Sequence, residues 1–338
     1  MPSFERDSNR IVIAGASSLL GAELKSLLEE SRFAGWDFRL VDEEVAAGTL
    51  TEAGGEPAVI QPVEEGSFDR ARLIFFTGSL EFSRANLKTA ARTGSSVVDL
   101  TGAALEDADE TRAVAWFPKL DSLRGEESPV GGKLFGVPSA AATATAALAL
   151  ALSKLGLIRM SVIHIQSASE AGRAGIEELE AQTGKLLSFQ PFGQQVFDAQ
   201  VAFNMLDRFG AGSRQKLQSV VERIRAEVGA CVGKKVGRPA LQVLHAPVFY
   251  GATFSVFAEV DVFDRKSIAE VCREAEFVIA PEGDPGPSNV SAAGEQSIVL
   301  SQPEHDPSDL GSFWIWGAAD NIRLPAWNAV KLAEKLVA

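Results

Sequence analysis

The stretch from Val137 to Gly156 constrains the fold more than any other part of the chain, because it reads as one helix made almost entirely of Ala and Leu. Pro138 disfavours helix at the residue before it and can open a helix after it, and the Ser139 hydroxyl can cap free N–H groups. Gly156 is typical of the position just past a helix end. No charged residue precedes Lys154 in this run, so we expect the helix to be buried on nearly all sides.

The first turn of this predicted helix is a place where an enzyme can hold a reactive thiolate, because the N–H groups and the helix dipole favour negative charge there. The turn offers Ser139, Ala140, Ala141, Ala142 and Thr143, and none of them is Cys. The sequence therefore predicts a helix start suited to a reactive thiolate, but no cysteine is present there.

Length and composition indicate a globular protein of two domains. At about 150 residues per domain, 338 residues suffice for two. The net charge of −13 argues against a general nucleic-acid binder. The cysteines, Cys231 and Cys272, and the histidines, His164, His245 and His305, show no disulfide or metal-site spacing. Neither a membrane span nor a signal-peptide pattern is found, so we expect a cytoplasmic protein.

The chain begins with a pattern typical of dinucleotide-binding domains. The apolar strand Arg10–Ala14 leads into the turn from Gly15 to Gly21, and a helix is predicted over Ala22–Glu30. Ser18 occupies the place of a middle glycine in that turn. Asp42 ends the next predicted strand, about 20 residues after the turn, where a carboxylate can bind the adenosine ribose of NAD. The alternative for Asp42 is a solvated acidic turn.

Further elements alternate between strand and helix over the first half. The strands are predicted at 38–41, 58–63, 73–76 and 96–100, with a helix at 79–93. This alternation favours a mostly parallel sheet with right-handed crossovers. The acidic segment 101–121 is expected to be a surface loop.

The pattern changes to longer strands after the central helix. Strands are predicted at 160–167, 241–250, 253–262, 277–280, 297–300 and 313–318, and helices at 174–187, 213–228, 266–275 and 325–337. These elements favour a mixed or antiparallel sheet with helices on one face, which is an α+β domain. The final helix is amphipathic and can return to the first domain.

Several stretches together resemble the aspartate-semialdehyde dehydrogenase family. They are 11–24, 76–101, 136–143, 166–172, 174–179, 247–251 and 319–323. Two further runs, Ala202–Leu206 and Ala246–Gly251, are most similar to the Usg-type branch, whose members lack the usual catalytic cysteine. The resemblance implies a Rossmann-type NAD(P)-binding domain over residues 1–135 with 319–338, and a catalytic-like dimerisation domain over 136–318. It also implies a homodimer and, for the family, reductive dephosphorylation of aspartyl phosphate in amino-acid biosynthesis.

The resemblance places the family's reactive groups on residues that cannot perform their roles. The nucleophile position is Ala140 and the general-base position is Ala252, and a methyl group neither attacks a carbonyl nor accepts a proton. The substrate-binding arginine corresponds to His245, whose imidazole lacks the two-pronged guanidinium fork. A second family arginine falls at or near Leu105. The glutamine beside the nucleophile is retained as Gln166.

For other positions implied by the resemblance, a functional and a structural interpretation are both open. Lys216 matches an anion-site lysine by a looser alignment, but it can equally be a solvated charge. The retained Asp320 and Asn321 correspond to residues near the nicotinamide. Gln166 can instead satisfy backbone groups near the central helix, and His245 in an apolar strand can be a buried structural histidine.

The resemblance also implies a cofactor site. Its residues are Gly15, Ser17, Ser18, Leu19, Gly21, Asp42 and Asn321. The basic segment that accepts the NADP 2′-phosphate in the family is here Asp42–Glu44, whose charge repels that phosphate. We therefore expect NAD or no cofactor, with NADP disfavoured. Pro325 stands where the family usually has glycine.

Two classes of function remain open. The first is a non-catalytic dimeric paralogue that binds a small molecule or a protein. The second is an NAD-dependent oxidoreductase with altered chemistry and substrate. Loss of the nucleophile, base and arginine positions favours the first, because these losses affect independent chemical roles.

Overall fold

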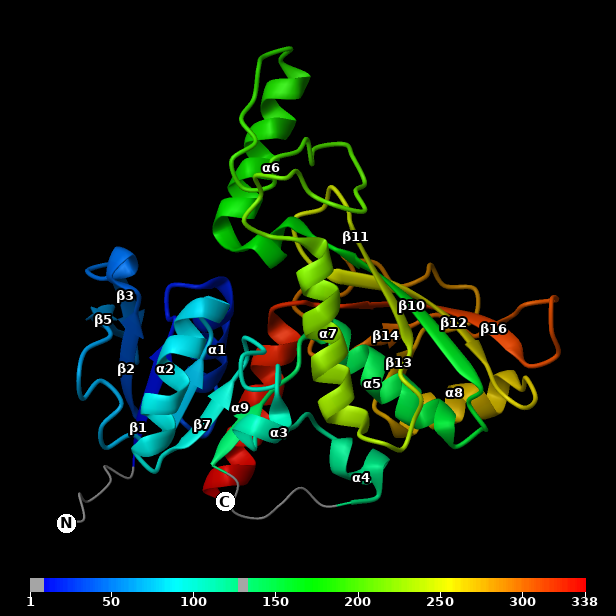
Figure 1. Cartoon of the computed structure of the whole chain (residues 1–338), viewed down its shortest axis with the longest axis horizontal. Coiled ribbons are helices and arrows are strands. Elements are labelled where there is room, and N and C mark those ends of the chain that lie inside the picture. Colours follow the sequence, from blue (N-terminus) through cyan, green and yellow to red (C-terminus); the bar gives the residue numbers. More distant parts are fainter. Residues whose placement is uncertain (1–8, 127–132) are drawn as a thin grey trace. The chain divides into compact units, whose positions relative to one another are not determined.

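The computed structural model describes residues 9–126 and 133–338, and the chain forms two compact units (Figure 1). Unit 1 contains Met1–Pro118, Glu127–Ser139 and Pro325–Ala338. Unit 2 contains Lys119–Glu126 and Ala140–Leu324.

In the described part of unit 1, seven strands form a parallel sheet. They are β1 (Arg10–Ala14), β2 (Asp37–Asp42), β5 (Gln61–Pro62), β6 (Leu73–Phe76), β7 (Ser96–Asp99), β8 (Val114–Ala115) and β9 (Leu134–Gly136). Their order is β5-β2-β1-β6-β7-β9-β8, and each recorded pair is parallel. This arrangement confirms the predicted parallel sheet.

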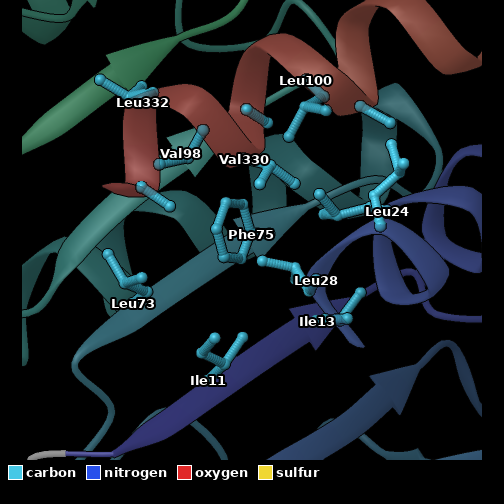
Figure 2. Close-up of a cluster of buried hydrophobic side chains, with 14 of the residues drawn as sticks. Ile11, Ile13, Leu24, Leu28, Leu73, Phe75, Val98, Leu100, Val330 and Leu332 are labelled. Carbon is cyan, nitrogen blue, oxygen red and sulfur yellow. The ribbon is translucent and has the colours of Figure 1, made fainter. Parts of the chain in front are cut away.

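Helices cover both faces of this sheet. They include α1 (Leu19–Glu29), α2 (Leu80–Arg92), the short α3 (Ala108–Thr111) and α9 (Arg323–Val337). Ile11 and Ile13 of β1 pack in one apolar cluster with residues of α1 and α9, and Val12 and Ala14 pack in another with residues of α2. Figure 2 shows the first cluster gathered around Phe75. A sheet buried on both faces explains the near-continuous apolar strands.

The prediction of one continuous strand over 58–63 is wrong. Its residues are divided between β5 and β4 (Glu56–Val59), and β4 forms a hairpin with β3 (Leu50–Ala53). Gly54 and Gly55 connect the two strands with φ of 62° and 80°, a conformation that glycine adopts without strain. The segment that follows β7 is also less exposed than expected, because residues 101–105 are buried.

Unit 2 is built on a mixed sheet, as predicted. Its described strands are β10 (Arg159–Gln166), β11 (Ala240–His245), β12 (Ala252–Glu259), β13 (Val278–Ile279), β14 (Val299–Leu300), β15 (Glu304–His305) and β16 (Ser312–Ala319). The order is β11-β10-β12-β16-β14-β13, with β15 also paired to β16. The β10–β11 pair is parallel, whereas β12 is antiparallel to both of its neighbours.

The helices of unit 2 are α4 (Leu120–Arg124), α5 (Ala140–Ser153), α6 (Gly172–Leu187), α7 (Leu217–Val232) and α8 (Arg265–Glu274). The Ala/Leu run predicted to be a buried helix is α5, and twelve of its fourteen residues are buried. The Arg124 guanidinium donates to the carbonyl oxygens of Ala230 and Cys231, near the end of α7. This contact holds α4 within unit 2. Among the described residues, no helix is long and apolar enough to cross a membrane.

Two helix starts differ from the predictions for reasons that side chains explain. α1 begins at Leu19 rather than Ala22, because the Ser18 hydroxyl accepts a hydrogen bond from Gly21 N–H and caps the helix. α7 begins at Leu217 rather than Ser213, because the Ser213 hydroxyl donates to the Val196 carbonyl and holds the preceding loop.

Helix α6 organises the long loop that follows it. The Gln182 side chain is fully buried, and its Oε1 accepts from the N–H groups of Val201 and Ala202. Its Nε2 donates to the carbonyl oxygens of Gly193 and Ala199. One amide thereby satisfies four backbone groups of the loop.

Replacing Gln182 with Leu should therefore destabilise this loop. Gln182→Leu leaves buried backbone groups without partners, and we expect a loss of roughly 2–4 kcal/mol in the free energy of unfolding. Urea unfolding measures the loss, and amide exchange should accelerate at Val201 and Ala202. Gln218→Leu, on an exposed part of α7, is the matched control. Equal stability of the two variants would contradict this role of Gln182.

Candidate functional site

Three positions of the expected catalytic site lie side by side at one end of the unit 2 sheet. The register pairs Gln166 of β10 with His245 of β11 and with Ala252 of β12. Ala252 in turn pairs with Ala319 of β16. Residues opposite one another on adjacent strands point to the same face, so these four side chains form one row. All four residues are buried.

Helix α5 places Ala140 at the same end of the sheet. The Thr145 hydroxyl donates to the Ala141 carbonyl at 2.8 Å and lies 2.9 Å from Nε2 of His164 on β10. The Thr145 hydroxyl is therefore within hydrogen-bonding distance of both the Ala141 carbonyl on α5 and the His164 ring on β10. A short connection makes α5 and β10 antiparallel, so the start of α5 lies toward Gln166.

His245 occupies an aromatic environment. Its ring lies 5.2 Å from the Phe197 ring and 5.3 Å from the Phe209 ring, measured between centroids. The residue is fully buried, and neither ring nitrogen has a hydrogen-bond partner among the described residues. Burial lowers the pKa of His245 to about 4, so the imidazole is neutral at pH 7. A neutral ring between two Phe side chains offers no positive charge to a carboxylate.

The Lys216 ammonium is used within its own loop. Nζ donates to the Ala211 carbonyl at 2.7 Å and to the Gly210 carbonyl at 3.2 Å. The side chain is exposed and lies just before α7. Its observed contacts thus stabilise the loop that leads into that helix.

Asn321 connects three segments around the row. Its Oδ1 accepts from Gly251 N–H at 2.9 Å, immediately before β12. Its Nδ2 donates to Ser169 Oγ and to Glu170 Oε1, both at 3.0 Å, in the turn that follows β10. Asp320 caps the start of α9 by accepting from the N–H groups of Ile322 and Arg323. The retained Asp-Asn pair therefore has a structural role within unit 2.

In unit 1, close packing accounts for the glycines of the first turn. Gly15 has φ of 92°, and a Cβ there would collide with the Gly78 backbone. A Cβ at Gly21 would collide with the Gly15 carbonyl oxygen and the Thr77 hydroxyl. Leu105, which we expected at or near the position of a family arginine, is buried and fills the space beside Gly136.

Ser18 does not project from the glycine turn. Its hydroxyl donates to the Thr77 carbonyl at 2.7 Å and accepts from Gly21 N–H at 2.8 Å. The N–H groups of Ser17 and Ser18 also have partners within unit 1, which are the Asp42 carboxylate and the Gly15 carbonyl. Within the described residues, the N–H groups of Leu19 and Leu20 remain unpaired at the start of α1. A helix start with free N–H groups favours an anion.

Two carboxylates follow β2, beside the glycine turn. Asp42 is buried, and its Oδ2 and Oδ1 accept from Ser17 N–H and Glu43 N–H, each at 2.8 Å. Glu43 is exposed and accepts from the Ser79 hydroxyl at 2.7 Å, at the start of α2. The sequence pattern indicated Asp42, but it contained no signal for Ser79, which lies on the loop after β6.

Other contributors were also missed from the sequence. Phe197 lies in an irregular loop and Glu170 in a short turn, and neither position has a spacing that identifies it. No group of His, Cys, Asp and Glu side chains suited to a metal ion occurs in residues 9–126 and 133–338.

Comparisons with known proteins give a consistent result. Residues 148–324 match the family model described as semialdehyde dehydrogenase, dimerisation domain. The chain is 29% identical over 333 residues to the USG-1 protein homolog of Pseudomonas aeruginosa, with 97% of each protein covered. It is 26% identical to aspartate-semialdehyde dehydrogenase 2 of Vibrio cholerae, again with 97% of each covered.

Solved structures agree with these relatives. A probable aspartate-semialdehyde dehydrogenase from Pseudomonas aeruginosa superposes with a TM-score of 0.86 at 29% identity, covering 97% of this chain and 98% of that one. Aspartate semialdehyde dehydrogenase II from Vibrio cholerae gives a TM-score of 0.84 at 25% identity with the same coverage.

The buried histidines should make stability depend on pH. Burial lowers the pKa of His164 and of His245 from 6.5 to about 4. As pH falls, these histidines are protonated in the unfolded chain at a higher pH than in the folded chain. The free energy of unfolding is therefore highest above pH 6.5 and decreases as pH falls toward 4. We expect a loss of roughly 2 kcal/mol per histidine between pH 7 and pH 5.

His245→Phe should remove about half of that loss, because Phe fits the aromatic environment and does not titrate. Chemical unfolding at a series of pH values measures the change. His305→Phe, at an exposed histidine, is the matched control. An unchanged pH dependence in His245→Phe would show that His245 is not neutral and buried in the folded state.

Proposed function

Because the chain belongs to the aspartate-semialdehyde dehydrogenase family, we propose that it is a dimeric, NAD-binding member that does not catalyse the family's reaction. The observation that supports this most directly is the row at the end of the unit 2 sheet. That row and the start of α5 present Gln166, His245, Ala252 and Ala140. None of these side chains is a cysteine-like nucleophile or a cationic carboxylate ligand, and burial, which lowers the pKa of His245 to about 4, leaves that imidazole a weak base.

The surroundings of these four residues support the loss of the family's reaction, and the two cysteines of the chain are not placed to replace the missing nucleophile. All four residues are buried, and His245 is enclosed by Phe197 and Phe209. The two cysteines are buried as well, and burial raises the pKa of each thiol to about 12, which disfavours the thiolate. Neither cysteine can therefore replace the missing nucleophile.

The fit of unit 1 to a dinucleotide supports the cofactor part of the proposal. The family uses NAD or NADP, which supplies or accepts a hydride. The free N–H groups of Leu19 and Leu20 suit a pyrophosphate. The Ser18 hydroxyl points inward to the Thr77 carbonyl, so the serine side chain does not block the approach of a pyrophosphate to this turn. Asp42 retains lone pairs that can accept from ribose hydroxyls.

The carboxylates after β2 favour NAD over NADP. A 2′-phosphate near Asp42 and Glu43 would face like charges. At about 4 Å and an effective dielectric near 20, one such pair costs roughly 4 kcal/mol. Screening and side-chain rotation reduce this to about 1–2 kcal/mol, which corresponds to a preference of about tenfold. The Ser79 hydroxyl limits the rotation of Glu43, so Glu43 contributes to the exclusion of the phosphate.

The second candidate is an NAD-dependent oxidoreductase with altered chemistry and substrate. The observation that favours it is the pair of N–H groups at the start of α1, those of Leu19 and Leu20, which have no partner within the described residues. Dinucleotide in the purified protein, together with hydride transfer to or from any small aldehyde or acid, would support this alternative over the first.

The purified protein should not reduce NADP with aspartate semialdehyde and phosphate. A typical enzyme turns over at about 10 per second, and we expect at least a thousandfold less here, measured by absorbance at 340 nm. Gln166→Ala, purified identically, is the control, because activity from a contaminating host enzyme would not change in that variant. Higher turnover that Gln166→Ala reduces would refute the non-catalytic assignment.

Calorimetric titration should show NAD binding about tenfold or more tightly than NADP. Glu43→Gln removes the charge but keeps an acceptor for Ser79, so it should strengthen NADP binding and leave NAD binding unchanged. Glu30→Gln, at an exposed carboxylate just after the last residue of α1, is the matched control and should leave both affinities unchanged. Tighter binding of NADP than NAD by the unmodified chain would overturn the assignment of the acidic turn, and no binding of either would overturn the cofactor proposal.

A further inference from the structure

The β3–β4 hairpin of unit 1 lies outside the seven-stranded sheet. Among the described residues, β3 pairs with β4 and with no other strand. One face of the hairpin is turned inward, because Ala53 and Ala58 pack against the apolar cluster that α1 and α9 share. Two side chains of α1 hold it there. The Lys25 ammonium donates to the Glu52 carbonyl, and the Glu29 carboxylate accepts from a backbone N–H of the hairpin turn at 2.9 Å. The hairpin is therefore fixed on unit 1.

The outward face of the hairpin is apolar at the end away from its turn. Leu50 of β3 lies directly opposite Val59 of β4, and alternation along the strands directs both side chains away from the inward alanines. Leu50 is 76% exposed and Val59 is 50% exposed. Val45, just before β3, is 91% exposed. The Thr49 hydroxyl donates to the Ala46 carbonyl, which keeps this segment beside the start of β3. We call Val45, Leu50 and Val59 the hairpin patch.

The chain around the hairpin patch is acidic throughout. Residues 40–69 contain eight carboxylates and neither Lys nor Arg, so this stretch contributes −8 to the net charge of −13. Glu44, Glu52 and Glu56 are exposed, and the first of them is next to Val45. An apolar surface within a ring of one charge favours a partner of the opposite charge.

The free edge of β4 supplies main-chain groups next to the hairpin patch. The Ile60 N–H donates to the Thr49 carbonyl at 3.0 Å, so Leu50 and Val59 form the next, non-hydrogen-bonded pair of the antiparallel ladder. The N–H and C=O groups of Val59 therefore point to the outer edge of β4, where no further strand lies in the described residues. Pro57 has no N–H, so this edge suits a short pairing rather than a long one.

We propose that the hairpin patch docks an extended segment of a partner protein in which Lys or Arg residues flank apolar ones. The segment adds to the edge of β4 at Val59, its apolar side chains cover Leu50, and its cations pair with the carboxylates of Glu52 and Glu56.

Charge complementarity distinguishes this occupant from others. A second copy of the chain would bring eight further carboxylates to the same surface, so like charges disfavour it there. Nucleic acids and anionic lipid surfaces are disfavoured for the same reason. Docking at the hairpin patch requires neither the family's reaction nor a bound dinucleotide, so it goes beyond the function proposed above.

Selection from a library of random short peptides displayed on phage, with the unmodified full chain as the target, tests this docking. The selected peptides should be enriched in Lys, Arg and apolar residues. Fluorescence polarisation then measures the affinity of each synthesised peptide for the same protein. Added salt should weaken binding, because it screens the attraction between the cations of the peptide and the carboxylates around the patch.

Two matched double variants locate the binding site. Leu50→Gln with Val59→Thr removes the apolar contacts at nearly constant side-chain size and should weaken binding at least about tenfold. Leu310→Gln with Val290→Thr changes two residues that are 84% and 76% exposed elsewhere on the chain, and it should leave the affinity unchanged. Glu52→Gln should reduce the salt dependence of binding. Urea unfolding confirms that each variant is folded.

Three results would overturn the docking of a basic segment. The first is a selection that enriches no peptide, or only peptides without Lys and Arg. The second is equal binding of the selected peptides to both double variants, which would place their site elsewhere. The third is a change of mass in light scattering for Leu50→Gln with Val59→Thr, which would show that a second copy of the chain covers the hairpin patch instead.

Discussion

The packing of α5 against the mixed sheet is the contact on which the rest of unit 2 depends. Small Ala side chains let the helix approach closely, and each buried Leu contributes roughly 2 kcal/mol. The Thr145–His164 hydrogen bond sets the position of the helix along β10. If β10 slipped by one residue, Gln166 would move to the opposite face, and the row with His245 and Ala252 would not exist.

The same burial decides what this row can do chemically. A cation at the position of His245 would need a partner, because desolvation of an unpaired charge is costly. Phe197 and Phe209 provide an apolar surrounding instead, in which a neutral imidazole is tolerated even with unpaired nitrogens. The surroundings of His245 therefore suit a neutral side chain. Restoring one reactive side chain would leave the surroundings unsuited to a charged substrate.

Unit 1 shows why a retained glycine motif does not by itself establish cofactor binding. Gly15 and Gly21 are required by close contacts with Gly78 and Thr77, whether or not a ligand is bound. The Asp42 carboxylate likewise organises the turn by accepting from Ser17 and Glu43. The groups that suit an anionic ligand are the N–H groups of Leu19 and Leu20 at the start of α1, which have no partner within the described residues.

The sequence by itself determined the architecture, because strand alternation, the Ala/Leu helix and its capping residues act over a few neighbouring positions. Through the family resemblance it also predicted Ala140, Gln166, His245 and Ala252 as site positions, and the strand register places the last three side by side. It did not show the β3–β4 hairpin, the contact between Ser79 and Glu43, or the placement of Phe197 beside His245. Only the tertiary structure decided these, because they join residues far apart in the chain, and side-chain contacts at that separation follow from strand register and helix packing rather than from local pattern.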